Sequence, residues 1–238
     1  MVVLVKESRL NGVPGQTSPG GERFRAQGAP APAAHVPVGR LVLASQSPRR
    51  RELLTQRGVR FDIVEPTFDD ADLSRGAVDP SAWVASLAYL KATGAMDRAR
   101  REGRSFDGAT FLGADTVVVD RGSLLGKPRN AVHAGEMLRS LRGHAHEVVT
   151  GVAMVEAGAP RREILTDRAT VWFSYLPDAL IDAYCASGAW RGKAGGYNLE
   201  EILRAGWPVR CEGDPTTVMG LPMRLLESRL ARFVPGAP

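Results

Sequence analysis

The sequence predicts an α/β fold, because segments with a strand pattern alternate with segments with a helix pattern along most of the chain. The alternation begins with a strand, a helix and a second extended piece, an order typical of a βαβ unit. With 238 residues, of which 44% are apolar and 24% charged, the chain is long enough to bury a complete core. We therefore expect one large domain, or one domain with two lobes, without internal repeats.

A strand followed by a helix opens the recognisable part of the chain. The apolar run over residues 40–44 has the composition and length of a buried strand. Ser47 is a favourable N-cap and Pro48 suits the first helical position, while Gly58 ends the helix that we predict over residues 48–57.

A long helix follows a short extended piece at residues 60–64. Trp83, Leu87 and Leu90 recur at a spacing of three to four residues, which is the period of an apolar helix face. We predict this helix from about residue 81 to residue 101. Later elements follow from the same patterns: a strand over 110–119, a turn at 120–123, a helix over 131–141, strands over 147–155 and 169–175, a helix over 177–186, a strand near 208–211 and a terminal helix from residue 221.

Residues 1–38 are rich in Gly, Pro and Ala and have neither a helical nor a strand period. We expect a flexible extension, or a start codon assigned too early, ahead of a domain over residues 39–238. No apolar run approaches the roughly 18 to 20 residues of a membrane span, and the N-terminus lacks the pattern of a secretion signal. The sequence therefore predicts a cytoplasmic protein without a membrane partner.

The formal charge of +5 and the pI of about 9.6 suit an anionic ligand, and they would also suit nucleic acid. The first 38 residues contain four basic and two acidic side chains, so +3 remains for the rest of the chain. That part has no stripe of interleaved basic and aromatic residues, so nucleic acid is not the expected partner. Cys185 and Cys211 lack the C-x-x-C spacing of a zinc or redox site. His144 and His146 are spaced to face one side of a strand but have no third metal ligand nearby, so all four are interpreted as structural.

Three arginines, Arg49, Arg50 and Arg51, fall in the first turn of the predicted helix at 48–57, where the helix dipole is already positive. Each misplaced cation costs ~0.3 to 1 kcal/mol when exposed, so an anionic partner is expected. Backbone N–H groups at a helix start and guanidinium groups together make a phosphate site. Because successive residues are rotated by about 100°, we expect only Arg49 and Arg50 to face the ligand. The alternative is three solvated arginines with local partners such as Glu52.

Asp115 lies in the middle of the apolar strand at 110–119, where a carboxylate without a partner would be costly to bury. A general base or a magnesium ligand would explain its position. A buried aspartate paired with an arginine or a backbone turn is an equally common reason for such a placement.

Three lysines are candidates for contact with phosphate. Lys91 interrupts the apolar face of the long helix, and Lys127 lies at a strand end between Gly126 and Pro128. Lys193 opens a glycine-rich loop that ends at Tyr197, whose ring could stack on a base. The alternatives are a lysine at the margin of its helix, a surface turn and an ordinary loop. The chain contains no P-loop, Rossmann fingerprint or Ser/His/Asp order, so neither hydride transfer nor acyl chemistry is supported.

Six short motifs follow one another along the chain: Leu43-Ala-Ser-Gln-Ser47-Pro-Arg-Arg50, Gly113-Ala-Asp-Thr116, Gly126-Lys-Pro128, His146-Glu-Val-Val-Thr150-Gly, Lys193-Ala-Gly and Val218-Met-Gly-Leu-Pro222. In this order and spacing they resemble the Maf family of nucleotide pyrophosphatases, from about residue 40 to the terminal helix. The resemblance implies an elongated, two-lobed α/β fold with a central mixed sheet and a deep cleft, similar to inosine triphosphate pyrophosphatases. It also implies hydrolysis of the α–β phosphoanhydride of canonical or modified nucleoside triphosphates with Mg²⁺ or Mn²⁺, and a link to cell-division arrest.

The resemblance assigns roles to individual residues. Asp115 accepts a proton from the attacking water and binds the metal, and the residues on the phosphate side are Ser45, Arg50, Lys91, Lys127 and Lys193. Arg49, Thr116 and Glu200 correspond to positions that tune the choice of nucleotide. Family members that prefer dTTP and UTP have glutamine in place of Glu200, whereas the branch that prefers methylated GTP has glutamate there, so both bases remain open. Asp69-Asp70 replaces an acidic motif of the family and makes Asp70 a second metal ligand.

A protein of another class is the main alternative: a non-catalytic binding protein that acts in septum control or on nucleic acid. The presence of Asp115 together with Lys91 and Lys127 favours the enzyme. The sequence is compatible with a homodimer but carries no signal that decides the oligomeric state.

Overall fold

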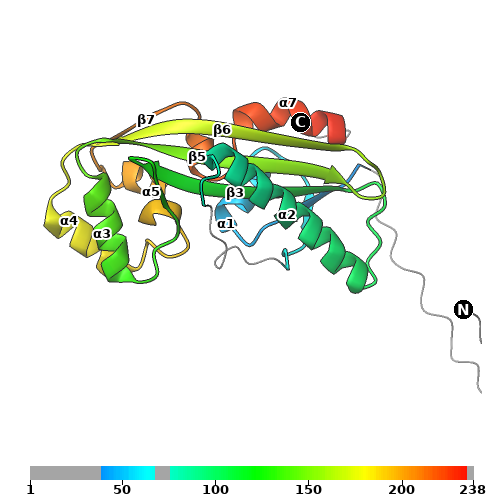
Figure 1. The fold of residues 1–238 in the computed structure, drawn as a ribbon, viewed down its shortest axis with the longest axis horizontal. Coiled ribbons are helices and arrows are strands. Elements are labelled where there is room, and N and C mark those ends of the chain that lie inside the picture. Colours follow the sequence, from blue (N-terminus) through cyan, green and yellow to red (C-terminus); the bar gives the residue numbers. More distant parts are fainter. Residues whose placement is uncertain (1–38, 68–75, 235–238) are drawn as a thin grey trace, which may run out of the picture. The chain divides into compact units, whose positions relative to one another are not determined.

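A computed structural model describes residues 39–67 and 76–234, which build a mixed α/β fold around a seven-stranded sheet (Figure 1). The strands are β1 (Leu41–Ala44), β2 (Phe61–Ile63), β3 (Thr110–Asp120), β4 (Ser123–Leu125), β5 (Ala145–Glu156), β6 (Arg162–Phe173) and β7 (Val209–Glu212). The helices are α1 (Pro48–Gln56), α2 (Pro80–Arg101), α3 (Ala131–Leu141), α4 (Asp178–Ser187), α5 (Leu199–Arg204), α6 (Pro215–Val218) and α7 (Met223–Phe233), with a 3₁₀ turn, η1 (Ala194–Gly196).

The sheet has the strand order β2-β1-β3-β5-β6-β7, and β4 pairs with β3 outside this path. β1 runs parallel to both β2 and β3, which confirms the predicted βαβ opening. Every later pair is antiparallel, from β3 with β5 to β6 with β7. The predicted α/β class with a central mixed sheet is therefore confirmed.

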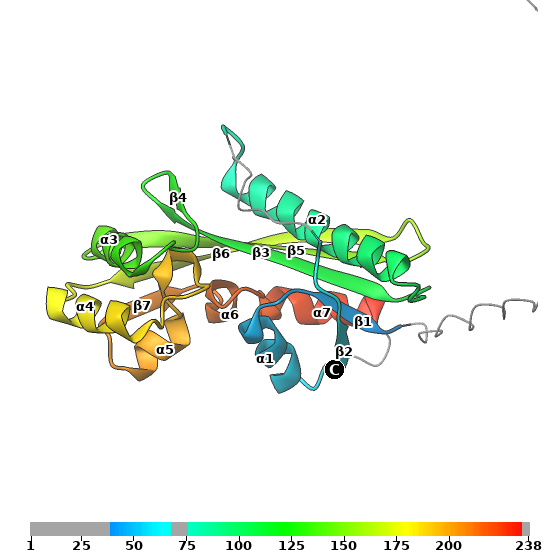
Figure 2. The ribbon, with the colours of Figure 1, turned by 90° about the horizontal axis from the view of Figure 1, so that it is seen from below.

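Helices cover both faces of the sheet (Figure 2). Because side chains alternate along a strand, Val42 and Ala44 pack with α2 on one face. Leu41 and Leu43 pack with α1 and α7 on the other face. The short strand β1 is consequently buried over its whole length, and this explains its uninterrupted apolar sequence.

A third apolar cluster lies where the ends of β5 and β6 meet α3, α4 and α5. Phe173 is fully buried here and makes edge-to-face contacts with Tyr197 and Trp207 at centroid distances of 4.9 and 6.3 Å. This cluster anchors the loop at residues 188–198, which carries the glycine-rich motif, against the sheet.

Several predicted bounds differ from the structure. β4 (residues 123–125) begins at the last residue of the turn predicted at 120–123 and is not among the predicted strands, and α5 and α6 are additional helices. β6 begins at Arg162, ahead of the predicted start at residue 169. Its first half pairs only with β5 among the described strands, so its residues are exposed or half-buried and lack the apolar pattern of a central strand. None of the helices in the described part of the chain is both long and apolar enough to cross a membrane.

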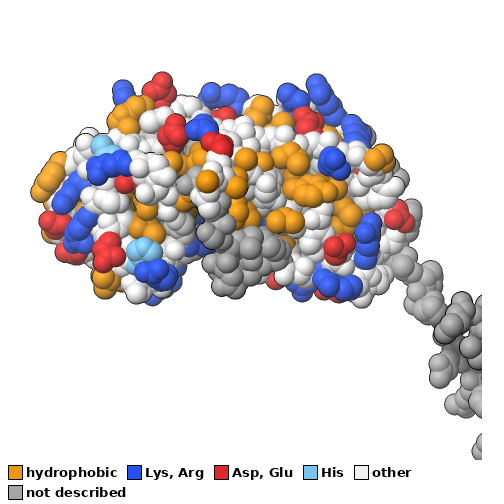
Figure 3. Space-filling model, in the orientation of Figure 1, with side chains coloured by type: hydrophobic (Ala, Val, Ile, Leu, Met, Phe, Trp, Pro, Cys, Tyr) orange, Lys and Arg blue, Asp and Glu red, His pale blue; other side chains and the backbone are white. Residues whose placement is uncertain are grey.

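The face seen in Figure 3 has apolar side chains in its middle and an intermixed set of basic and acidic side chains around them. No continuous basic stripe crosses this face within the described residues. Residues 1–38, for which an extension is predicted, lie outside the described residues.

Candidate active site

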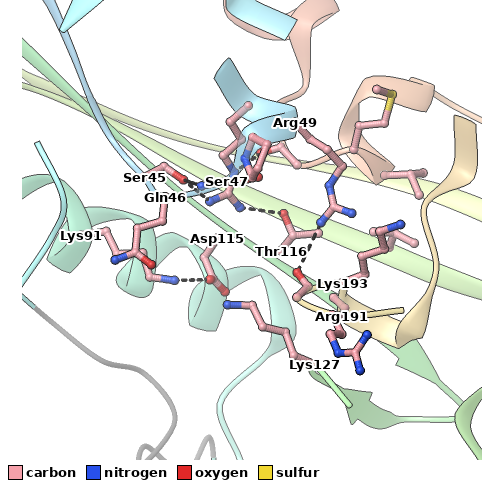
Figure 4. A pocket seen from close by; sticks show the side chains of 18 of the residues that line it. Ser45, Gln46, Ser47, Arg49, Lys91, Asp115, Thr116, Lys127, Arg191 and Lys193 are labelled. Atoms are coloured by element: carbon pink, nitrogen blue, oxygen red, sulfur yellow. Dashed lines mark hydrogen bonds and ion pairs between the residues drawn. The ribbon is translucent and has the colours of Figure 1, made fainter. Parts of the chain in front are cut away.

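The candidate site lies at an uncovered stretch of the edge of β3. β1 ends at Ala44, opposite Gly113, and β4 begins to pair with β3 only at Val118. Among the described strands, none pairs with this edge of β3 over residues 114–117. A pocket of about 710 Å³ opens there, between the end of β1 and the loop that follows β4 (Figure 4).

The gap explains why one pocket collects side chains from both faces of the sheet. Asp115 and Thr116 are neighbours in β3 and point to opposite faces. Asp115 contacts α2 and Thr116 contacts α1, yet both line the pocket because no strand separates the two faces at this point of the described sheet.

The described lining is strongly cationic. Six of its side chains are basic and two are acidic, which gives these residues a formal charge of +4. The basic residues are Arg49, Arg50, Lys91, Lys127, Arg191 and Lys193, and the acidic ones are Asp115 and Glu201. A concave site of this charge suits a ligand with several phosphate groups.

Asp115 and Lys91 form the most buried ion pair among the described residues that line the pocket. Lys91 Nζ donates to Asp115 Oδ1 at 2.6 Å, and the two side chains are only 12% and 10% exposed. The pairing offsets the cost of burying either charge alone. Figure 4 shows Lys91 and Lys127 directed toward Asp115 from two sides. The structure therefore places a carboxylate between two ammonium groups, a combination that can hold a phosphate group next to a proton acceptor.

The arginines of α1 divide as their positions on the helix predict. Arg49 and Arg50 line the pocket, whereas Arg51 turns away and donates to the backbone oxygen of Gln46 at 3.4 Å. Burial lowers the pKa of Arg49 from its usual value, and the nearby Glu201 carboxylate opposes that shift. Ser47 is the N-cap residue, as predicted, but its side chain makes no capping hydrogen bond.

Among the described residues, three acceptors hold the guanidinium of Arg50. Its Nε donates to the backbone oxygen of Gly220 at 2.9 Å. Its terminal nitrogens donate to Ser45 Oγ and Thr116 Oγ1, both at 3.2 Å. Ser45 is almost fully buried and also accepts a hydrogen bond from the backbone of Ser47 at 3.1 Å. Arg50 is thus a preorganised cation at the start of α1.

The opposite wall of the pocket contains Lys193, which is buried and ion-paired with Glu201. Tyr197 borders the pocket, but its ring packs against Phe173 and its hydroxyl lies 2.7 Å from His146 Nε2. These contacts make Tyr197 part of the apolar core, so the expectation that it stacks on a base gains no support.

Glu200 and Asp70 lie elsewhere than the other candidates. Glu200 does not line the described pocket and pairs with Arg204 on the outer side of α5. Its neighbour Glu201 is rotated by about 100° around the helix and reaches the pocket instead. Asp70 lies outside the described residues, although Thr67, three positions earlier, lines the pocket. Among the residues that the structure describes, no group of three His, Cys, Asp or Glu side chains could hold a metal.

Arg191 and Glu201 line the pocket without having been singled out from the sequence. Both lie in segments whose apolar residues follow neither a helical nor a strand period, so the sequence gives no sign of their position. Tertiary folding places them in the same pocket as Asp115 and Thr116 of β3. The other predicted residues, from Ser45 and Arg50 to Lys127 and Lys193, are brought together in one pocket.

A family model described as Maf-like protein matches residues 40–233. The chain belongs to the Maf-like protein family. The match covers every described element from β1 to α7. Each of the six Maf-like motifs contributes at least one residue to the pocket, so the motifs that define the resemblance converge on one place in the fold.

Curated relatives of this Maf-like chain carry the name dTTP/UTP pyrophosphatase. The protein from Pelotomaculum thermopropionicum is 37% identical over 81% of this chain and 96% of its own length. The protein from Moorella thermoacetica is 40% identical over 82% of this chain and 96% of its own length. The protein from Vibrio cholerae is 36% identical over 82% of this chain and 99% of its own length.

Proposed function

We propose that the chain is a nucleoside triphosphate pyrophosphatase, which hydrolyses the α–β phosphoanhydride to release a nucleoside monophosphate and pyrophosphate. One observation carries the proposal: the six Maf-like motifs meet in a pocket whose described lining has a charge of +4 around a single inner carboxylate, Asp115. The names of the relatives, dTTP/UTP pyrophosphatase, support the same reaction.

In this proposal Asp115 accepts the proton of a water molecule whose oxygen attacks the α-phosphorus. The bond to the bridging oxygen breaks, and pyrophosphate leaves. Lys91 holds the Asp115 carboxylate in place, and Arg50 and Lys127 bind the phosphate oxygens together with Ser45 and Lys193. Fixed positive groups that meet the developing charge supply most of the catalysis.

A divalent cation, Mg²⁺ or Mn²⁺, belongs to the proposal. Mg²⁺ is commonly bound by one or two carboxylates together with substrate phosphates, and the inner position of Asp115 fits that pattern. Asp115 and Asp70 would hold the ion, which when bound neutralises charge on the phosphates.

The proposed substrates are dTTP and UTP, with Arg49, Thr116 and Glu200 as the residues that set the choice of base. Arg49 and Thr116 line the pocket, and Glu200 acts from the adjoining helix α5. We also propose a cytoplasmic location, where nucleoside triphosphates are available. A homodimer, which sedimentation analysis would test, and a link to cell division stay predictions.

The test is pyrophosphate release from dTTP, UTP, CTP, GTP and 7-methyl-GTP with Mg²⁺ or Mn²⁺. Asp115→Asn is expected to lower turnover by about 100- to 1,000-fold, the cost of removing one well-placed electrostatic group. Asp97→Asn, on the exposed side of α2, is the matched control and keeps full activity. A folded Asp115→Asn protein with full activity would remove Asp115 from this role. A wild-type chain that is inert with every nucleotide would favour the non-catalytic binding protein.

A further inference from the structure

A chain of hydroxyl groups connects the pocket with the interior of the sheet. Arg50 donates to Thr116 Oγ1 at 3.2 Å, and Thr116 Oγ1 lies 2.9 Å from Thr150 Oγ1. Thr150 Oγ1 in turn donates to the backbone oxygen of Thr217 at 2.7 Å. Thr116 and Thr150 stand directly opposite each other in the β3–β5 register, and Thr150 is fully buried.

The groups at the two ends of this series of hydroxyl groups, Arg50 and the Thr217 carbonyl, fix the direction of its hydrogen bonds. The carbonyl of Thr217 can only accept, so the single hydroxyl proton of Thr150 is used there. Thr150 Oγ1 is therefore the acceptor toward Thr116, whose own proton is used in that bond. Toward Arg50, Thr116 presents a lone pair, which is what a guanidinium, a donor without acceptor capacity, requires.

Thr150 also supports a second contact of Arg50. The carbonyl that it binds belongs to α6, and the turn after α6 ends at Gly220, whose backbone oxygen accepts from Arg50 Nε at 2.9 Å. Two of the three described acceptors around Arg50, the Thr116 hydroxyl and the Gly220 carbonyl, are consequently linked to the Thr150 hydroxyl. The third acceptor, Ser45, lies on the other side of the guanidinium, in the loop after β1.

We propose that Thr150 is a positioning residue for phosphate binding, an inference that rests on the proposed function. Its hydroxyl orients Thr116 and fixes the turn at residues 217–220, and through both it holds the Arg50 guanidinium toward the pocket. A further consequence concerns Thr116, whose proton is occupied: a ligand atom that meets Thr116 Oγ1 must be a hydrogen-bond donor.

The experiment compares three variants. Thr150→Val removes the hydroxyl at nearly constant volume, and Thr150→Ser keeps it. Thr110→Val is the matched control, because Thr110 is also fully buried on the sheet and its hydroxyl also donates to a carbonyl, that of Phe233, but it lies far along β3 from the pocket. Calorimetry with inorganic pyrophosphate measures anion affinity, dTTP hydrolysis gives kcat and KM, and urea unfolding gives stability.

We expect Thr150→Val to weaken pyrophosphate affinity and to lower kcat/KM by about ten- to a hundredfold, because a misplaced Arg50 would lose its hydrogen bonds to the charged phosphate groups. Thr150→Ser should stay within about threefold of wild type. Both valine variants lose stability, but only Thr150→Val should lose affinity. Equal affinity in the two valine variants, or no rescue by serine, would overturn the proposal.

The pyrophosphate measurement separates this inference from the activity. If the wild type hydrolyses no nucleotide and Thr150→Val still weakens pyrophosphate binding, the positioning role stands and the proposed reaction fails. A wild-type chain that does not bind pyrophosphate overturns the inference as well. If Thr150→Val does not fold, Thr150→Cys, which keeps only a weak donor, takes its place. Its pyrophosphate affinity must then be at least about threefold weaker than that of the wild type. Wild-type affinity in Thr150→Cys would contradict the proposal.

Discussion

Gly113→Ala should damage the active site through the packing of α2 against β3. A Cβ atom at Gly113 would lie 2.1 Å from the backbone oxygen of Ala88 and 2.7 Å from the backbone nitrogen of Ala92. Gly113 has no positive φ, so the strain comes from the contact and not from the backbone conformation. Ordinary contact begins near about 3.5 Å, so α2 must move away by more than about 1 Å.

This movement reaches the site directly. Lys91 lies between Ala88 and Ala92 on α2, and its partner Asp115 follows Gly113 by two residues in β3. Displacing the helix pulls Lys91 Nζ away from Asp115 Oδ1, which lies 2.6 Å from it in the wild type. We expect a loss of about 1–3 kcal/mol in the free energy of unfolding, typical of overpacked cores. We expect a loss of about 100-fold in kcat/KM, the cost of a 1 Å misplacement.

Urea unfolding and dTTP hydrolysis measure the two effects. Gly135→Ala on α3 is the control, because the nearest atom to its Cβ, at 2.7 Å, is the flexible guanidinium end of Arg139. In a helix interior this change is expected to be neutral or to stabilise by up to about 1 kcal/mol. Wild-type stability and activity in Gly113→Ala would refute the reasoning, because they would show that the position of α2 on β3 does not require a residue without a Cβ atom at position 113.

Two further predictions concern charge. Burial lowers the pKa of His146 to about 4, so between pH 6.5 and 4 the unfolded chain binds this proton and the folded chain does not. The free energy of unfolding, measured with urea, should therefore fall by about 2 kcal/mol between pH 7 and pH 5. His146→Phe should abolish this fall, whereas His133→Gln, at a partly exposed site, should retain it. An equal fall in His146→Phe would contradict the assignment. Glu201→Gln frees Lys193 from its ion pair and should tighten pyrophosphate binding several-fold in calorimetry. Glu200→Gln, outside the described pocket, is the control: it should leave pyrophosphate affinity unchanged and alter only the preference among bases in hydrolysis assays. A lower pyrophosphate affinity in Glu201→Gln would show that the Lys193–Glu201 pair itself binds phosphate.

Much of the site was predictable because its residues break local rules. Arg49 and Arg50 stand out because cations at a helix start oppose the helix dipole. Asp115 and Lys91 stand out because each interrupts an apolar pattern, and the structure pairs them with each other. The sequence did not indicate that Lys91 is the partner of Asp115, since the two lie 24 positions apart and meet only when α2 packs on β3.

The remaining features depend on tertiary packing. The first half of β6 pairs with β5 on one edge, but no described strand pairs with its other edge. Its residues therefore alternate between exposed and half-buried, and the sequence lacks the apolar pattern by which a central strand is recognised. Arg191 and Glu201 carry no local signal, because a charged residue in a loop or short helix is ordinary until the fold places it in a pocket. The resemblance identified Glu200, whereas the rotation of α5 directs the adjacent Glu201 into the pocket.

The uncovered edge of β3 accounts for how two neighbouring residues can serve separate tasks. In a fully paired strand, Asp115 and Thr116 would face different layers of the protein and could not meet one ligand. Here Asp115 takes its partner from α2 and Thr116 from α1, and the gap between β1 and β4 opens both to the same pocket. The described bonds connect Lys91 to Asp115 on one face of β3 and Thr150 to Thr116 on the other, so we expect substitutions at Lys91 and at Thr150 to have additive effects on kcat/KM. Strong non-additivity in the double variant would show that the two faces of β3 are coupled through the strand itself.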